Sequence, residues 1–394
     1  MDPNSSTSDN PRRLLLINYE YPPLGGGGGH ASQMICRHLV RMGWEVSVLT
    51  SRFDDQPKEE DDEGVRVFRI PTLRRYKEKC SVFEMAIFLI MSVLCAPSIY
   101  KKTKPDCVLT FFSIPSGPAA WFLKELYRVP YVVALRGGDV PGFLPEQLAT
   151  FHKLSSWLTR LVWRGAKALT TNSQGLKNLA LAFDQQTPIH VIPNGVDERF
   201  FLKRNFTAPK PILYAVTVGR LSEQKKLFRL LQVWKQLQGE GLMSIKLNIV
   251  GDGPLRDRLE TQSQSDGTLN QTVFFRGWCD RDLITRHYHN ADVFVMSSDF
   301  EGMPNVILEA MASSLAIIAT KAPGTDELVI NQKNGFLIDK TQLGDFASYL
   351  KGLLAQQDAL WSLQNASFEL VQKYTWQSVS ESYRDLIEGC LSES

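Results

Sequence analysis

The segment ADVFVMSSDFEGMPNVILEAMASS (residues 291–314) contains the pattern that decides the fold. Residues 292–296 form a short apolar run, which is typical of a strand buried in a parallel sheet. The polar loop that follows leads into a stretch with helical spacing, and Pro304 suits the first turn of that helix. This order predicts one unit of a parallel α/β sheet, in which ligands bind at the carboxyl ends of the strands.

The same alternation of strand and helix extends along the whole chain. Strands are expected at 14–18, 45–50, 65–70, 107–112, 131–135 and 167–172, and again at 212–219, 244–251, 272–277, 292–298, 315–320 and 335–338. A chain of 394 residues suits two domains. We therefore expect an α/β fold with Rossmann-like domains at 1–200 and 201–375, followed by a last amphipathic helix within 376–394. The acidic stretch 54–63 is interpreted as a solvated loop.

Composition limits the function. The net charge of +2 argues against nucleic acid as a partner. Six cysteines stand singly, without the spacing of a metal site, so we expect a reducing, cytoplasmic location and no bound metal. The apolar run 14–17 is too short for a signal peptide.

Residues 82–99 are mostly apolar and have basic flanks on both sides. Glu84 and Pro97 leave an uninterrupted apolar run shorter than the roughly 20 residues that cross a bilayer. A buried domain helix is one interpretation. A peripheral contact of residues 74–104 with the inner face of a membrane is the other.

The loop NYEYPPLGGGGGH (residues 18–30) follows the first strand. Its glycines allow close approach of a ligand, and a helix that begins near His30 would offer free N–H groups to a phosphate. A flexible loop without a ligand is the alternative. The spacing does not reproduce the dinucleotide-binding pattern G-x-G-x-x-G.

The loop GRLSEQKK (residues 219–226) follows the strand at 212–219. Arg220 and Lys225 would stand beside the carboxyl end of that strand, where two cations can hold a diphosphate and stabilise it as a leaving group without metal. Two solvated surface charges are the alternative.

Two carboxylates occur in the segment 291–314, Glu301 before the helix and Glu309 inside it. Asn305 and Glu309 are four residues apart and share one helix face. A buried carboxylate needs partners, and the vicinal hydroxyls of a ribose would serve, because an ionised carboxylate only accepts hydrogen bonds. A structural salt bridge to Glu309 is the alternative. The amides of residues 302–305 would face a phosphate or a sugar.

The second half of the chain contains, in this order, the segments GRLSEQKK, IVGDGPL, VFFRG, EGMPNVILEAMA, APGTDELV and NGFLI. With this combination and order, the sequence closely resembles glycosyltransferase family 4 over nearly the whole chain. The resemblance implies the GT-B architecture, in which the parallel sheets of two Rossmann-like domains face a central cleft. It also implies retention of anomeric configuration, and a final helix that returns to the first domain.

The resemblance also implies roles for individual residues. Arg220, Lys225 and Glu301 would form the catalytic group, with the two cations on the diphosphate and Glu301 on the hydroxyls of the donor sugar. Glu309 would bind the ribose. The remaining donor-binding positions would be Gly25 and Gly26 near the phosphates, Arg276 where the backbone contacts the base, and Gly302, Met303, Pro304 and Asn305 at the helix start.

One position departs from the family pattern. Many members have His-Gly-x-Asp after the strand that corresponds to residues 131–135, and here the segment reads LRGGDVPG, with Arg136 in place of the histidine. Arginine cannot act as a base, so Arg136 could bind an anion or orient Asp139. Asp139 could contact the donor sugar or the acceptor. A structural pair between Arg136 and Asp139 is the alternative.

The sequence therefore predicts a retaining, metal-independent transferase that needs no cofactor. It would move a hexose-type sugar from a nucleotide-diphosphate sugar to a hydroxyl of a glycan or lipid-linked acceptor. A catalytically silent protein that binds nucleotide sugars and a GT-B sugar-nucleotide epimerase are the alternatives. The missing histidine motivates the first of these.

Overall fold

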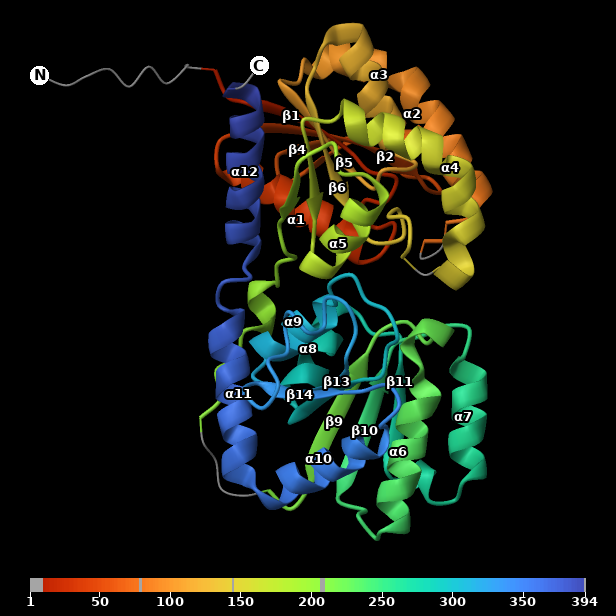
Figure 1. The fold of residues 1–394 in the computed structure, drawn as a ribbon, viewed down its shortest axis with the longest axis vertical. Coiled ribbons are helices and arrows are strands. Elements are labelled where there is room, and N and C mark those ends of the chain that lie inside the picture. The colour runs from red at the N-terminus through yellow and green to blue at the C-terminus, as the bar shows by residue number, and fades with distance from the viewer. Residues whose placement is uncertain (1–9, 78–79, 144, 206–209, 393–394) are drawn as a thin grey trace, which may run out of the picture. The chain divides into compact units, whose positions relative to one another are not determined.

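A computed structural model of the protein describes residues 10–77, 80–143, 145–205 and 210–392. Its chain forms two compact units (Figure 1). Unit 1 comprises Met1–Asn194 and Trp376–Ser394, and unit 2 comprises Gly195–Thr375. Each unit has its own sheet and its own hydrophobic core.

The sheet of unit 1 has eight strands in the order β3-β4-β2-β1-β5-β6-β7-β8. All neighbouring strands are parallel except β3 and β4. Side chains of the central strands are buried on both faces, which explains their continuous apolar sequences. The strands are β1 (Arg13–Ile17), β2 (Glu45–Arg52), β3 (Glu59–Asp62), β4 (Val65–Pro71), β5 (Cys107–Phe111), β6 (Tyr131–Leu135), β7 (Ala168–Thr171) and β8 (Ile189–Val191).

The prediction of a loop throughout residues 54–63 was wrong, because β3 lies within this acidic stretch. β3 pairs antiparallel with β4 at the edge of the sheet. The carboxylate of Glu60 lies 2.5 Å from the guanidinium of Arg69, and that of Glu59 lies 3.2 Å from Arg66. Cross-strand ion pairs of this kind stabilise a strand whose own residues have low strand propensity.

Helices cover both faces of the unit 1 sheet (Figure 1). Helices α2–α5 pack on one face, and α1 packs with α12 on the other. In α12 the side chains of Trp376, Tyr383 and Ile387 are buried, and the Tyr383 hydroxyl lies 3.0 Å from Oγ1 of Thr170. The helices are α1 (Gly27–Arg41), α2 (Val82–Thr103), α3 (Gly117–Tyr127), α4 (Pro145–Gly165), α5 (Gln174–Phe183) and α12 (Trp376–Ser392).

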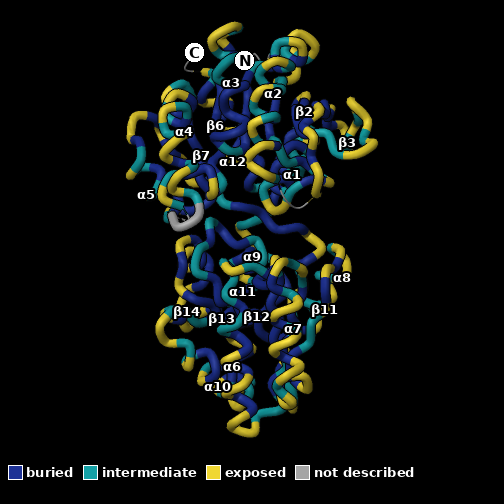
Figure 2. The backbone as a smooth tube through the Cα atoms, turned by 90° about the vertical axis from the view of Figure 1, so that its right-hand side faces the viewer, coloured by how far each residue is buried: buried dark blue, intermediate teal, exposed yellow. Residues whose placement is uncertain are grey.

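The sheet of unit 2 has six parallel strands in the order β11-β10-β9-β12-β13-β14. They are β9 (Leu213–Val218), β10 (Ile245–Val250), β11 (Val273–Gly277), β12 (Val293–Met296), β13 (Ala316–Thr320) and β14 (Gly335–Ile338). Figure 2 shows the central strands β12 and β13 buried, while the outer faces of the covering helices are exposed.

Two apolar clusters hold the helices of unit 2 to its sheet. One involves α6, α7 and α10, and the other involves α8 and α9. The helices are α6 (Leu227–Gly239), α7 (Arg256–Ser265), α8 (Arg281–His289), α9 (Asn305–Ala312), α10 (Gly344–Ala355) and α11 (Gln357–Val371), with 3-10 turns η1 (Glu198–Phe200), η2 (Glu223–Lys225) and η3 (Leu269–Gln271).

The first segment of unit 1 ends at Asn194, six residues before the boundary expected at residue 200. Residues beyond Asn194 belong to unit 2 because their contacts lie there. Val196 forms a bridge with Thr375, and the ring of Phe200 packs edge-on against Tyr288 with their centroids 5.7 Å apart.

Replacing Ile387 with alanine should destabilise unit 1, because its side chain is fully buried between α12 and the sheet. We expect the free energy of unfolding to fall by about 2–5 kcal/mol in denaturant titrations. Glu388→Ala, at an exposed position of the same helix, is the control and should change stability little. Equal stability of Ile387→Ala and Glu388→Ala would contradict the packing of α12 on unit 1.

Candidate functional site

The carboxyl ends of β9 and β12 bring Lys225 and Glu301 together. These strands are hydrogen-bonded neighbours, so the loops that follow them meet at one edge of the sheet. Nζ of Lys225, in η2, lies 2.6 Å from Oε1 of Glu301, whose residue is only 8% exposed. Two of the three predicted catalytic residues therefore form a partly buried ion pair.

A network of polar contacts holds these two loops against each other. Oγ of Ser297 donates to the carbonyl oxygens of Lys225 and Lys226 at 2.9 and 3.1 Å. The side-chain amide of Gln224 donates to the carbonyl of Phe300 at 2.6 Å. These bonds fix the backbone on both sides of the ion pair, so the positions of Lys225 and Glu301 do not depend on the pair alone.

Arg220 lies beside this pair with an exposed side chain. Among the described residues, no carboxylate or hydrogen-bond acceptor contacts its guanidinium. Arg220, Lys225 and Ser298 help to line a small pocket at the carboxyl ends of β9, β10 and β12. Because Glu301 already compensates Lys225, Arg220 gives this pocket an unneutralised positive charge.

Two glycines allow the loops of this edge to approach closely. A Cβ atom on Gly251, whose φ is +134°, would lie 2.0 Å from the carbonyl oxygen of Gly219. A Cβ atom on Gly324, whose φ is +77°, would lie 1.9 Å from the carbonyl oxygen of Gly302. Side chains are therefore excluded at both positions, which accounts for glycine in IVGDG and APGT.

Glu309 lies inside α9, where the Tyr288 hydroxyl donates to its Oε2 at 2.9 Å. Burial raises the pKa of the Glu309 carboxyl from 4.5 to about 7, and Arg281 and the Tyr288 hydroxyl oppose the rise. Arg281 is itself paired with Asp197. Glu309 therefore has a neutral hydroxyl as its hydrogen-bond partner, and not the salt bridge that was the alternative.

The start of α9 differs by one residue from the prediction. Its first residue is Asn305, and Pro304 occupies the N-cap position rather than the first turn, with φ −75° and ψ 104°. Met303 and Pro304 are buried, whereas Gly302 and Asn305 are partly exposed. Proline has no N–H, so only Gly302, Met303 and Asn305 have backbone amides that could face a ligand here.

Arg276 lies in β11, at the edge of the unit 2 sheet. Its Nε donates to Oδ1 of Asn248 on β10 at 2.7 Å, and its guanidinium carbon lies 5.1 Å from the ring centroid of Phe274. Among the described residues, no hydrogen bond or ion pair joins its side chain to Lys225, Glu301 or Glu309. The structure thus separates Arg276 from the ion-pair group by β10.

In unit 1, Gly25 and Gly26 lie directly before α1, which begins at Gly27 and not near His30 as expected. Gly25 has φ +86°, and no side chain caps the helix from Gly26. The carboxylate of Glu20 lies 3.8 Å from the fully buried guanidinium of Arg74. Burial raises the pKa of Glu20, and the nearby Arg74 and the Gly26 amide oppose the rise.

Asp139 organises the loop that follows β6. Its Oδ1 accepts the amides of Arg136 and Gly137 at 2.9 and 3.1 Å, and its Oδ2 accepts the amide and hydroxyl of Ser113 at 2.8 and 3.2 Å. Burial raises the pKa of Asp139, although these hydrogen bonds oppose the rise. Both carboxylate oxygens are therefore already engaged.

The Arg136 side chain makes no hydrogen bond to Asp139. Its Nη1 donates to Oδ1 of Asn194 at 2.7 Å, and its guanidinium stacks 4.0 Å from the ring centroid of Phe111. Nε and Nη2 are buried and have no hydrogen-bond partner. Asp139 therefore accepts a hydrogen bond from the backbone amide of Arg136 and does not pair with the Arg136 guanidinium. Two buried donors of that guanidinium remain unused.

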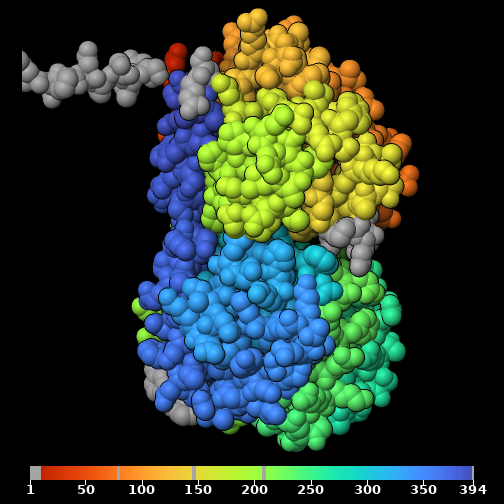
Figure 3. Space-filling view, in the orientation of Figure 1, coloured from red at the N-terminus to blue at the C-terminus, as the bar shows by residue number. Residues whose placement is uncertain are grey.

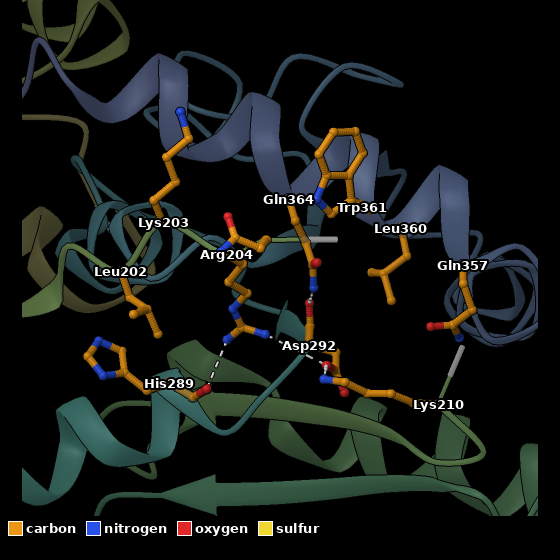
Figure 4. A pocket seen from close by; sticks show the side chains of 11 residues that line it. Leu202, Lys203, Arg204, Lys210, His289, Asp292, Gln357, Leu360, Trp361 and Gln364 are labelled. Carbon is orange, nitrogen blue, oxygen red and sulfur yellow. Dashed lines mark hydrogen bonds and ion pairs between the residues drawn. The ribbon is translucent and has the colours of Figure 1, made fainter. Parts of the chain in front are cut away.

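A cavity of about 380 Å³ lies at the opposite end of the unit 2 sheet, near the start of β12 (Figure 4). Its cations have partners within unit 2, since Lys210 and Arg204 lie 2.7 and 3.7 Å from the carboxylate of Asp292, and Arg204 also donates to the carbonyls of Tyr288 and His289. None of the predicted site residues lines it. Within the described part of the chain, no three His, Cys, Asp or Glu side chains are grouped as a metal site.

Family models match both units. The model described as "Glycosyl transferase 4-like domain" matches residues 26–195, and that described as "Glycosyl transferases group 1" matches residues 198–369. The chain belongs to glycosyltransferase family 4. It is therefore a GT-B glycosyltransferase with two parallel-sheet α/β domains, as the sequence predicted.

Individual proteins resemble this family 4 glycosyltransferase over most of its length. An Escherichia coli UDP-Gal:α-D-GlcNAc-diphosphoundecaprenol α-1,3-galactosyltransferase is 31% identical over 75% of this chain and 76% of its own. A sulfoquinovosyl transferase of Arabidopsis thaliana is 25% identical over 98% of this chain and 74% of its own. The sucrose-phosphate synthase structure from Thermosynechococcus elongatus has a TM-score of 0.82 at 19% identity, covering 97% of this chain and 100% of that one.

Replacing Glu309 with glutamine should flatten the pH dependence of stability. Between pH 4.5 and about 7 the folded protein holds a proton on Glu309 that the unfolded chain releases, so stability falls as pH rises through this window. Glu309→Gln lacks this proton. Urea unfolding at pH 5 and 7.5 should show a smaller decline for the variant than for the native protein.

Glu369→Gln, at an exposed carboxylate of the same unit, is the matched control and should keep the native decline. An identical decline in the native protein and in Glu309→Gln would show that the carboxyl is ionised throughout the window.

Proposed function

We propose that this glycosyltransferase transfers a hexose-type sugar, with retention of anomeric configuration and without a metal ion, from a nucleotide-diphosphate sugar to a hydroxyl of a glycan or lipid-linked acceptor. The observation that carries the proposal is the unneutralised Arg220 beside the Lys225–Glu301 pair at the carboxyl ends of β9 and β12. A diphosphate supplies the negative charge that this edge of the sheet lacks.

The two cations would bind the diphosphate in different ways. Arg220 presents a planar guanidinium to two phosphate oxygens, whereas Lys225 is a point charge held in place by Glu301. Both would stabilise the leaving nucleoside diphosphate as the glycosidic bond breaks, which is the task that a metal ion performs in other transferases. Glu301 keeps a carboxylate at the same place for the hydroxyls of the donor sugar.

Glu309 would accept hydrogen bonds from the two hydroxyls of the ribose. The ionised carboxyl is the stronger acceptor for both hydroxyls, and one of its lone pairs is already taken by the Tyr288 hydroxyl on Oε2. With the pKa of Glu309 near 7 in the absence of a ligand, binding of the donor favours the ionised form.

We propose attack from the face of the leaving group. The acceptor oxygen forms the new bond to the anomeric carbon as the bond from that carbon to the phosphate oxygen breaks. The acceptor proton passes to the departing β-phosphate, so no protein base is required. This route suits a chain in which arginine replaces the family histidine, since arginine cannot take the proton.

We propose that Arg136 is the residue of unit 1 that contacts substrate, because its Nε and Nη2 are buried donors without partners. Asp139 would act through the loop that it holds. Gly25 and Gly26 would lie near the phosphates, as the family resemblance implies, and Arg276 near the base.

Relatives support the choice of substrates. The name of the galactosyltransferase gives UDP-Gal as its donor and a lipid-linked sugar as its acceptor, and the Anabaena HepE structure, with a TM-score of 0.71 at 18% identity, contains UDP. UDP-sugars are therefore the first donors to test. No disulfide joins any of the six cysteines, all of which lie in the described part of the chain, and this supports a cytoplasmic location.

Removing either cation should slow transfer strongly. We expect Arg220→Ala and Lys225→Ala each to lower kcat by about 100-fold to 1,000-fold, the effect of losing one donor to a developing negative charge. Release of the nucleoside diphosphate from UDP-glucose and UDP-galactose, with and without sugar or lipid-linked acceptors, is the measurement. Arg258→Ala and Lys235→Ala remove exposed cations of the same unit and should leave turnover unchanged.

Near-native turnover in both site variants would contradict the assignment. Conversion of the free donor into another nucleotide sugar without any acceptor would indicate an epimerase. Donor binding without turnover under any condition would indicate a silent nucleotide-sugar-binding protein.

A further inference from the structure

The outer surface of α2, α3 and α4 exposes several large apolar side chains. All three helices pack on the same face of the unit 1 sheet, with α3 between α2 and α4, so their opposite faces point away from that sheet. Their residues supply the orange to yellow surface at the upper right of Figure 3. We call this surface the α2–α4 face. Its most prominent apolar side chains are Phe83, Ile90, Leu94, Leu126, Leu154 and Trp157.

These side chains form stripes along the helices. Phe83, Ile90 and Leu94 are separated by seven and four residues and share one side of α2, and Lys101 continues the same stripe. On α4, Leu154 and Trp157 are 74% and 67% exposed. The exposed apolar side chains therefore follow the helical period along α2 and α4 rather than standing singly.

Exposed cations flank these stripes, although Lys102 at the end of α2 is paired with Glu59 of the acidic strand β3. Lys101 and Lys104 are exposed at the end of α2, Arg128 follows α3, and Lys153 precedes the stripe of α4. Among the described side chains of residues 80–165, Glu125 is the only exposed carboxylate, and Asp106 is half-buried. The α2–α4 face thus combines an apolar centre with a positive rim, and a negatively charged partner with an apolar interior is complementary to it.

Helix α2 does not have the packing expected of a core helix. By length and composition it could cross a membrane, and only 28% of its most apolar window is buried. Phe88 and Ala96 nevertheless pack into the sheet, and Ser81 and Glu84 form a capping box at the start of the helix. The expectation of a buried domain helix is corrected to a helix with one side on the sheet and the other exposed.

We propose that the α2–α4 face binds the surface of an anionic lipid bilayer, with Phe83, Leu94, Leu154 and Trp157 inserted at the headgroup level and the lysines on the lipid phosphates. Helices that lie in a membrane interface have this division into an apolar side and cationic flanks. The sequence indicated residues 74–104 alone, of which 78 and 79 lie outside the described residues. The structure adds α4, which is distant in sequence and supplies the tryptophan.

Binding to lipid does not depend on the proposed transfer, so the two can fail separately. The experiment is co-sedimentation of the full-length protein, without nucleotide sugar, with vesicles of phosphatidylcholine alone or with 30% phosphatidylglycerol. We expect binding to the anionic vesicles only, weakened by 0.5 M salt because screening removes most of the attraction between exposed charges.

Two double variants test the face itself. Leu154→Ser with Trp157→Ser removes apolar contact on α4, and Lys101→Glu with Lys153→Glu reverses two charges of the rim. Each should lower the partition coefficient by about tenfold or more. Ile330→Ser with Lys235→Glu changes an exposed apolar residue and an exposed lysine of unit 2 and should bind as the native protein does.

Absence of binding to anionic vesicles at low salt would overturn the proposal, as would native partitioning of both face variants. Sedimentation velocity without lipid provides the other decisive outcome. Self-association that the α4 variant abolishes would show that a second copy of the chain covers this face, and would also overturn the lipid assignment. Circular dichroism spectra equal to the native spectrum verify that the variants fold.

Discussion

The ion pair between Lys225 and Glu301 is the central interaction at the edge of unit 2 that we propose binds the donor. The pair forms because β9 and β12 are adjacent parallel strands, so their carboxyl ends present both loops at one edge. A cation that is already paired cannot supply the charge for a ligand by itself. Arg220 is therefore the group that makes the pocket positive, and Lys225 contributes position as much as charge. The same arrangement keeps a carboxylate where donor-sugar hydroxyls would lie.

Glu309, Asp139 and Arg136 also differ in how many of their hydrogen-bonding groups already have partners. Glu309 is held by a neutral hydroxyl rather than a cation, which lets burial bring its pKa to about 7. A carboxyl in that state favours a ligand that donates hydrogen bonds, because binding offsets the cost of ionisation. Asp139 has both oxygens filled by the loop that it organises, whereas Arg136 has two donors unused. In our proposal, the groups whose hydrogen bonds are occupied shape the site, and the unused donors of Arg136 bind substrate.

Sequence patterns predicted the features that depend on neighbouring residues. Every strand expected from apolar runs is present, because fully buried parallel strands need continuous apolar sequence. The acidic composition was misleading at β3, where Glu59 and Glu60 pair with Arg66 and Arg69 only seven and nine residues away on β4. Features that depend on distant residues were missed. One is the exposed apolar side of α2, because the packing of the described helices decides which side is covered. The Glu20–Arg74 pair and the Tyr288 hydroxyl on Glu309 join positions that no local pattern relates.

The most direct test of the central claim is a thermal-shift comparison of nucleoside diphosphates with the matching monophosphates, using uridine, guanosine and adenosine. Binding to the folded state alone raises its apparent stability. If Arg220 and Lys225 hold a diphosphate, one diphosphate should stabilise the native protein clearly more than its monophosphate, and Lys225→Ala should remove the difference between them. Equal shifts from the two phosphates, or no shift from any of the nucleotides, would contradict a diphosphate site at the ends of β9 and β12.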